Sequence, residues 1–201
     1  MNFLAHLYLA GNDEALRLGA LLGDFVRGMA ALEQYDAPLQ RGIRLHRHID
    51  SFTDALPQVI GLRESFQPPF RRYAGIIIDL GLDHELAIRW NACSTVTLDS
   101  FDRDVRRLLE RHRGLVLPGL ARFMAYADRR GLFAAYADEQ ELLYSLRGIG
   151  TRLKRPNPLH RCDEIWDETG PRIAAVFESV FDDVQFEVED WLKSRSITTG
   201  S

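Results

Sequence analysis

Cysteine is scarce and long apolar runs are absent from this chain of 201 residues. Its two cysteines, Cys93 and Cys162, lack CxxC spacing, which argues against a disulfide framework and favours a reducing compartment. No apolar run approaches the ~20 residues needed to cross a bilayer. The opening stretch MNFLAHLYLAGNDEA has neither a basic leader nor a typical cleavage site. We therefore expect a cytoplasmic protein that does not associate with membranes.

Lysine is almost missing as well. Lys154 and Lys193 are the only lysines, and arginine supplies the other 23 of the 25 basic residues. This bias reflects either genomic base composition or arginines that hold phosphate or carboxylate groups with their planar guanidinium. The formal net charge of −4 argues against nucleic-acid binding through bulk charge.

Hairpin signals of the Asn-Gly type between alternating runs are also absent, so the sequence predicts an all-α fold, a compact multi-helix bundle. Asn12 and Asp36 are the expected N-caps of its first two helices. Residues 73–78 could form a short strand, but the helical pattern around them favours a helix. We expect one domain over residues 1–195 and a disordered tail over 196–201. The predicted helices cover residues 13–28, 37–53, 57–66, 70–93, 99–113, 117–130, 137–149 and 161–192.

The segment GIIIDLGLDHELA places acids among apolar residues. Asp79 follows three isoleucines and precedes a leucine, and burying its charge costs several kcal/mol unless it is paired or binds a metal. Asp83 lies at i+4, about 40° away on the same helical face, and His84 points about 100° from Asp83. One helix can therefore supply two carboxylates and an imidazole to a metal site.

The segment LHRHIDSFTD carries a second such group. His46 and Asp50 are four residues apart and share a helical face, and Asp54 continues the row if the helix extends that far. His48 lies about 200° around the helix from His46, so a regular helix cannot direct both rings to one site. We expect His46 at the site and His48 at the surface or behind a ligand.

Two further candidates stand in apolar segments. Asp24, in ALLGDFVRG, is either a ligand or a helix-end residue bonded to its own backbone, with Arg27 as an available partner. His6, in NFLAHLYLA, taken alone fits a buried core histidine better than a ligand. Together, however, these segments bring more acids into a helical bundle than it tolerates without a cation. Carboxylates and imidazoles without thiolates suit Mn²⁺, Mg²⁺ or Fe²⁺ better than a structural zinc.

At these residues the sequence resembles a known family. MNFLAHL at the start, DFVRG at 24–28, HRHIDSFTD at 46–54 and DLGLDH at 79–84 are similar to the acyl-carrier-protein phosphodiesterases, also called holo-ACP hydrolases. The resemblance implies an all-helical enzyme, distantly similar to the HD phosphohydrolases, that removes 4′-phosphopantetheine from holo acyl carrier protein, with Mn²⁺ preferred. The adjacent pair reads Asp83-His84, the reverse of the His-Asp order of HD enzymes. The positions that match the family motifs are His6, Asp24, His46, Asp50, Asp79, Asp83 and His84.

The resemblance also implies roles for these side chains. The ion is expected on Asp24, His46 and Asp79, with Asp50 or Asp83 completing its shell. His84 or His6 would pass a proton to the leaving serine oxygen. Arg27 and Arg47 would neutralise charge on the phosphoryl oxygens, or else are exposed helix arginines paired with local acids.

Acyl carrier proteins are small and acidic, so a basic docking surface is expected. The predicted patch consists of Arg41, Arg44 and Arg47 on one helix, followed by Arg63, Arg71 and Arg72. Two other readings stay open: an HD-like nucleotide phosphohydrolase, and a helical scaffold without catalytic activity whose acids cap helices and pair with arginines. The sequence also leaves open whether the chain forms an oligomer.

Overall fold

The computed structural model describes residues 1–115, 120–121, 125 and 133–196. Every regular element within these residues is helical, which confirms the all-α class. The α-helices are α1 (Phe3–Leu9), α2 (Glu14–Leu22), α3 (Gly28–Leu32), α4 (Ala37–Ala55), α5 (Pro57–Ser65), α6 (Ala74–Ile88), α7 (Trp90–Cys93), α8 (Leu98–Arg111), α10 (Glu139–Arg152) and α11 (Asp163–Ser196). Short 3₁₀ turns are η1 (Arg71–Tyr73), η2 (Arg113–Leu115), η3 (Ala134–Ala137) and η4 (Leu159–Arg161).

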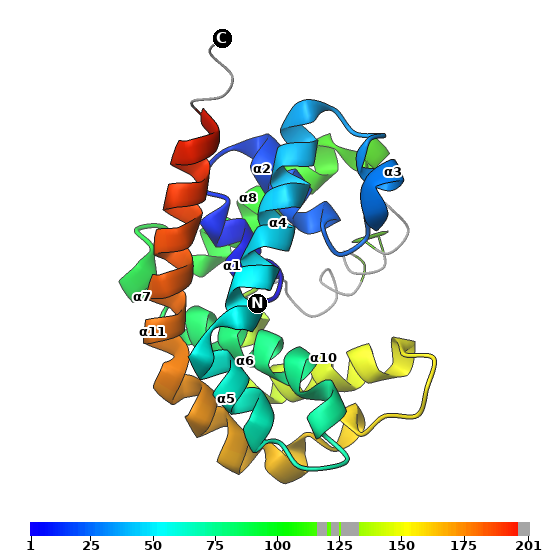
Figure 1. Ribbon diagram of the computed structural model, residues 1–201, viewed down its shortest axis with the longest axis vertical. Helices are drawn as coiled ribbons and strands as arrows, with labels where there is room; N and C mark the ends of the chain where they lie inside the picture. Colours follow the sequence, from blue (N-terminus) through cyan, green and yellow to red (C-terminus); the bar gives the residue numbers. More distant parts are fainter. Residues whose placement is uncertain (116–119, 122–124, 126–132, 197–201) are drawn as a thin grey trace.

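The site is supported by contacts among four helices, α1, α2, α4 and α6. The helix α4 packs closely along α2, and α1 lies against both α2 and α6. The long helix α11 runs along one edge of the molecule and packs on α4, α5 and α6 (Figure 1). The helix α6 has buried apolar residues on most of its sides, among them Ile77, Leu80 and Leu86, and is therefore the central helix of the bundle.

Local sequence signals explain where several helices begin. The Asp36 carboxylate accepts the Leu39 N–H at 3.0 Å and caps α4, as predicted. Pro57 is the first residue of α5, where its missing N–H costs nothing. The helix α2 is capped by Asp13, which accepts the Leu16 N–H at 2.9 Å, and not by Asn12.

Two predicted helices are shorter than expected. The helix predicted over residues 13–28 ends at Leu22; a turn over residues 23–25 follows, α3 begins at Gly28, and the Arg47 guanidinium donates to the carbonyls of Val26 and Gly28 in this stretch. The helix predicted over residues 70–93 begins as η1 and is interrupted at Arg89, between α6 and α7. Residues 73–78 belong to η1 and α6, so the strand alternative is wrong.

Two predictions fall largely outside the described residues. Most of the helix predicted over 117–130 lies there, and so does the tail beyond residue 196. The other predicted helices are confirmed with small shifts at their ends, and α11 extends to Ser196. Among the described residues, none of the helices combines the length and apolar character that spanning a membrane requires. Cys93 and Cys162 are both free.

Candidate functional site

Two histidines and an aspartate from separate helices meet at one point. Asp50 on α4 binds both rings: its Oδ1 is 2.9 Å from Nε2 of His6 on α1, and its Oδ2 is 3.2 Å from Nε2 of His46. The two imidazoles are stacked, with centroids 3.9 Å apart, and both are almost completely buried. His46 and Asp50 are one helical turn apart on α4, as the i,i+4 spacing predicts.

Asp24 reaches the same point from the turn after α2. Its Oδ1 lies 3.6 Å from Nε2 of His46, and its side chain is about half exposed. Gly23 makes this approach possible, since a Cβ at Gly23 would stand 2.2 Å from Cγ of His46. Arg47, donating to the carbonyl of Val26 at 2.8 Å, fixes the turn that carries Asp24.

The surroundings of His6 and His46 shift the pKa values of the two imidazoles in opposite directions. Burial, together with the neighbouring His46, lowers the pKa of His6 to about 4. Burial also opposes a charge on His46, but its contacts with Asp24 and Asp50 outweigh this effect and raise the pKa of His46 to about 9. The two histidines in turn hold the pKa of Asp50 far below its usual range, although burial alone would raise it. At neutral pH the protein without metal therefore has a neutral His6, a protonated His46 and an ionised Asp50.

This charge state predicts how stability depends on pH. The pKa of His46 is 6.5 in the unfolded chain and about 9 in the folded protein. Protonated His46 therefore contributes stability that is complete below pH 6.5 and is lost as the pH rises through 9. With a chelator present, the thermal midpoint of the wild type should fall between pH 7 and pH 9 by several degrees more than that of His46→Gln. Equal pH profiles for the two proteins would show that His46 is not held as a cation.

Asp79 and Asp83 lie on α6 but serve different partners. Asp79 lines the pocket described below, and its Oδ1 accepts from the amino group of Met1 at 2.9 Å. Asp83 is completely buried and accepts the backbone N–H groups of Asn2, Leu4 and Ala5 at 3.1, 2.8 and 3.2 Å. Burial raises the pKa of Asp83 to about 7 against the opposing effect of these donors. Asp83 thus caps α1, and its geometry gives no support to the ligand role predicted for it.

The cap predicts a large contribution of Asp83 to stability. Asp83→Ala leaves three backbone N–H groups at the start of α1 without their acceptor, so we expect a loss of about 3 kcal/mol in the free energy of unfolding. The matched control is Asp13→Ala, which removes one contact at the exposed start of α2 and should cost about 1 kcal/mol. Urea denaturation of both variants measures the difference, and equal losses would contradict the assignment.

The other predicted residues are dispersed. His84 is buried, contacts the Tyr136 carbonyl through Nδ1 at 2.6 Å and packs against the edge of Trp166, so it does not reach the two stacked histidines. Arg27 is exposed at the start of α3. His48 contacts Glu187 at 2.8 Å and stacks on Trp191 of α11, as expected of a residue outside the site.

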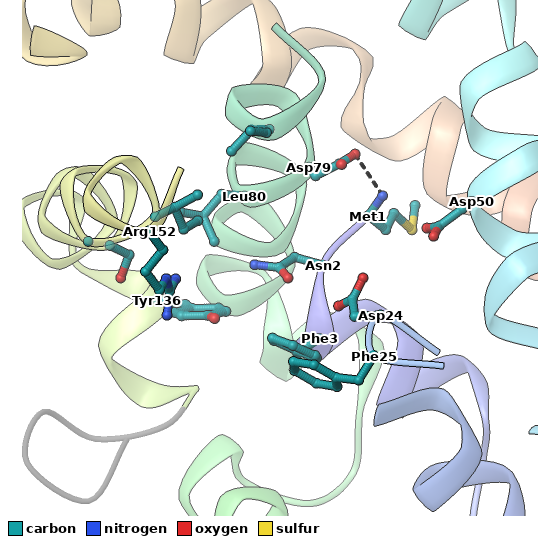
Figure 2. A pocket seen from close by; sticks show the side chains of 14 residues that line it. Met1, Asn2, Phe3, Asp24, Phe25, Asp50, Asp79, Leu80, Tyr136 and Arg152 are labelled. Atoms are coloured by element: carbon teal, nitrogen blue, oxygen red, sulfur yellow. Dashed lines mark hydrogen bonds and ion pairs between the residues drawn. The ribbon is translucent and has the colours of Figure 1, made fainter. Parts of the chain in front are cut away.

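A pocket of about 380 Å³ opens beside the histidines and acids. Figure 2 shows Asp24, Asp50 and Asp79 along one side and Tyr136 and Arg152 along the other. Apolar side chains complete the wall, including Phe3 and Phe25, whose rings stack at 6.3 Å. The pocket therefore has an acidic end and an apolar body.

Sequence reasoning missed this second wall. Arg152, Ser145 and Ile149 come from α10, far along the chain from the four motifs, and no spacing rule connects them to Asp50. Gly23 was also missed, although a glycine directly before a motif acid is a usable signal of close approach.

The donor atoms fit a divalent cation. Among the described residues, His6, His46 and Asp50 offer ligand atoms that all lie within 4.8 Å of one another, and Asp24 stands beside His46. Two imidazoles with carboxylates form a donor set suited to Mn²⁺ or Fe²⁺. A cation at this place would also neutralise the carboxylates of Asp24 and Asp50, as the proton on His46 does when no cation is bound.

Comparison with known proteins agrees with the resemblance. A family model described as "Acyl carrier protein phosphodiesterase" matches residues 1–184. A relative of that name from Photorhabdus laumondii is 36% identical over 160 residues, which cover 79% of this chain and 80% of that protein. One from Serratia proteamaculans is 36% identical over 156 residues, covering 77% and 80%. No solved structure matches the chain.

Proposed function

Because the chain belongs to the acyl carrier protein phosphodiesterase family, we propose that it hydrolyses the phosphodiester between 4′-phosphopantetheine and holo acyl carrier protein with the help of a divalent cation. The products are 4′-phosphopantetheine and apo-carrier protein. The observation that carries the proposal is the group formed by His6, His46 and Asp50 at the acidic end of a pocket.

We assign the cation to His6, His46 and Asp50, with Asp24 beside them. Mn²⁺ is the proposed ion, and Mg²⁺ or Fe²⁺ suit the same oxygen and nitrogen donors. When bound, such an ion polarises a phosphoryl oxygen and activates water for attack on phosphorus. Of the ligands expected from sequence, Asp83 is left out because it caps the start of α1, and Asp79 because it is not part of the group formed by His6, His46 and Asp50.

The side chains around the pocket orient the substrate. Asp50 holds both imidazoles, so it fixes the donor atoms relative to one another. The apolar body of the pocket, with Phe3, Phe25 and Leu80, excludes water and offers a surface for the pantetheine arm. Arg47 acts through the turn that carries Asp24 and makes no direct contact with the phosphate in this proposal.

Asp79 is the proposed general acid. It lines the pocket, and burial raises the pKa of its carboxyl, although the Met1 amino group opposes the rise. A carboxyl group kept protonated more readily than usual can deliver a proton to the departing serine oxygen. His84, buried against Tyr136 and Trp166, has no access to that oxygen.

The role of Asp79 predicts a dependence on the leaving group. Asp79→Asn should lower kcat for holo-carrier hydrolysis by about 100-fold, since general acid catalysis contributes roughly that much. Hydrolysis of bis(4-nitrophenyl) phosphate, whose leaving group needs no proton, should change by less than about fivefold. Equal losses on the two substrates would assign Asp79 a structural role instead.

One assay tests the overall proposal. Purified protein is incubated with holo acyl carrier protein and Mn²⁺, and intact mass spectrometry follows the carrier and the released arm. We expect apo-carrier protein and free 4′-phosphopantetheine, and neither when a chelator is present. If the carrier protein stays unchanged and nucleotides from a panel are hydrolysed, the protein is a nucleotide phosphohydrolase instead. Inactivity on all of these substrates would favour the helical scaffold without catalytic activity.

A further inference from the structure

A long stretch without acids forms one wall of the pocket. Residues 142–162, called the basic segment below, contain no Asp or Glu but five Lys or Arg, in a chain whose formal net charge is −4. The segment covers most of α10, η4 and the connection between them. Its residues Ser145, Gly148, Ile149 and Arg152 line the pocket, and Figure 2 shows Arg152 across the pocket from Asp50.

Three cations of the basic segment are available to a partner. Arg152, Lys154 and Arg155 are exposed, and none of them forms an ion pair with a residue that the structure describes. By contrast, Arg147 lies 3.6 Å from Asp163, and Arg161 binds Glu164. The unpaired cations are therefore grouped at the end of α10 and just beyond it.

The backbone that carries these cations is braced. Asn157 donates through Nδ2 to the Gly150 carbonyl at 2.9 Å, and its Oδ1 accepts the Leu159 N–H at 3.2 Å. From η1, the Tyr73 hydroxyl donates to the Pro156 carbonyl at 3.2 Å. A charged surface held in this way loses little conformational entropy when a partner binds.

We propose that Arg152, Lys154 and Arg155 form the docking surface for the acidic carrier protein. The inference rests on the proposed function, because it takes the carrier protein as the partner. Positive charge directly beside the pocket would hold an acidic protein where its prosthetic arm can enter. A long nucleic acid fits less well as the partner. Outside the basic segment the chain has a more negative net charge than the chain as a whole, and this charge would repel the phosphate backbone.

This surface differs from the one predicted from sequence. Arg41 donates to the Leu192 carbonyl of α11 at 3.2 Å, and Arg63 is paired with Asp54. Arg44 is exposed, but neither it nor Arg41 lines the pocket. Substitution of Arg44 therefore tests whether the carrier protein binds to the patch predicted from sequence instead.

Binding of labelled apo-carrier protein, followed by fluorescence anisotropy, tests the proposal. The apo form has no arm, so the measurement does not depend on catalysis. Lys154→Glu and Arg155→Glu should each weaken binding about 5- to 10-fold at low salt, and the wild-type affinity should fall as salt increases. Arg103→Glu, an exposed reversal on α8 away from the pocket, should stay within twofold. Thermal midpoints equal to wild type confirm that the variants fold, and Lys154→Gln should show a smaller loss of the same sign.

Several results would overturn the docking surface. One is that the wild type does not bind apo-carrier protein, and another is that Lys154→Glu and Arg155→Glu each change its affinity by less than twofold. A third is that Arg44→Glu weakens binding more than these two variants do. The last is that an RNA oligonucleotide binds the basic segment while the carrier protein does not. Failure of the proposed function is a separate result, namely carrier protein that binds but keeps its phosphopantetheine.

Discussion

Replacing Asp50 with Asn is expected to lower kcat/KM for release of 4′-phosphopantetheine from holo-carrier protein by on the order of 1000-fold, or about 4 kcal/mol of transition-state stabilisation. Asp50 is the shared partner of Nε2 of His6 and Nε2 of His46, and it is itself a proposed ligand. An amide has the same shape but no charge and only one acceptor oxygen, so it weakens the cation site and can accept from only one of the two imidazoles. Mass-spectrometric product release measures the loss.

The matched control is Asp54→Asn. Asp54 lies one turn further along α4, is about half exposed and pairs with Arg63 outside the pocket. Its loss should leave kcat/KM within about threefold, since an exposed ion pair contributes little. Similar activity in the two variants would mean that the carboxylate at position 50 has no special role.

Substituting Gly19 by Ala should destabilise the fold by about 3 kcal/mol or more. A Cβ at Gly19 would stand 2.5 Å from the Cα of Gly42, so the clash is with the backbone of α4 and a side-chain rotation cannot relieve it. Separating α2 from α4 would also move Asp24 relative to His46. Urea denaturation measures the loss of stability.

Gly61→Ala provides the comparison. Gly61 is an exposed residue of α5, and a Cβ there meets nothing within 4 Å. Because alanine is the better helix former, this change should stabilise by up to about 1 kcal/mol. If both glycines respond alike, the close contact between α2 and α4 is not what holds these helices together.

Much of the fold follows from signals local to the sequence. Asp36 begins α4 and Pro57 begins α5 as predicted, because caps and proline act through neighbouring backbone groups. The end of α2 could not be predicted in this way. The stretch that follows α2 is held by Arg47, which lies on another helix and donates to the carbonyls of Val26 and Gly28.

The site shows the same division. The i,i+4 spacing of His46 and Asp50 was enough to place both on one face of α4. The equal spacing of Asp79 and Asp83 suggested a shared metal, yet Asp83 is directed to the start of α1. Helical spacing defines a face but not the element that packs on it, so the backbone partners of Asp83 were not accessible from sequence.

Titration with Mn²⁺, followed by electron paramagnetic resonance of the free ion, tests the central claim most directly. The wild type should bind the ion at the site formed by His6, His46 and Asp50, the Asp54→Asn variant should bind it equally well, and Asp50→Asn and His46→Gln should bind it at least about tenfold more weakly. Wild-type protein that binds no Mn²⁺, or that binds it no better than the Asp50 and His46 variants, would contradict the account.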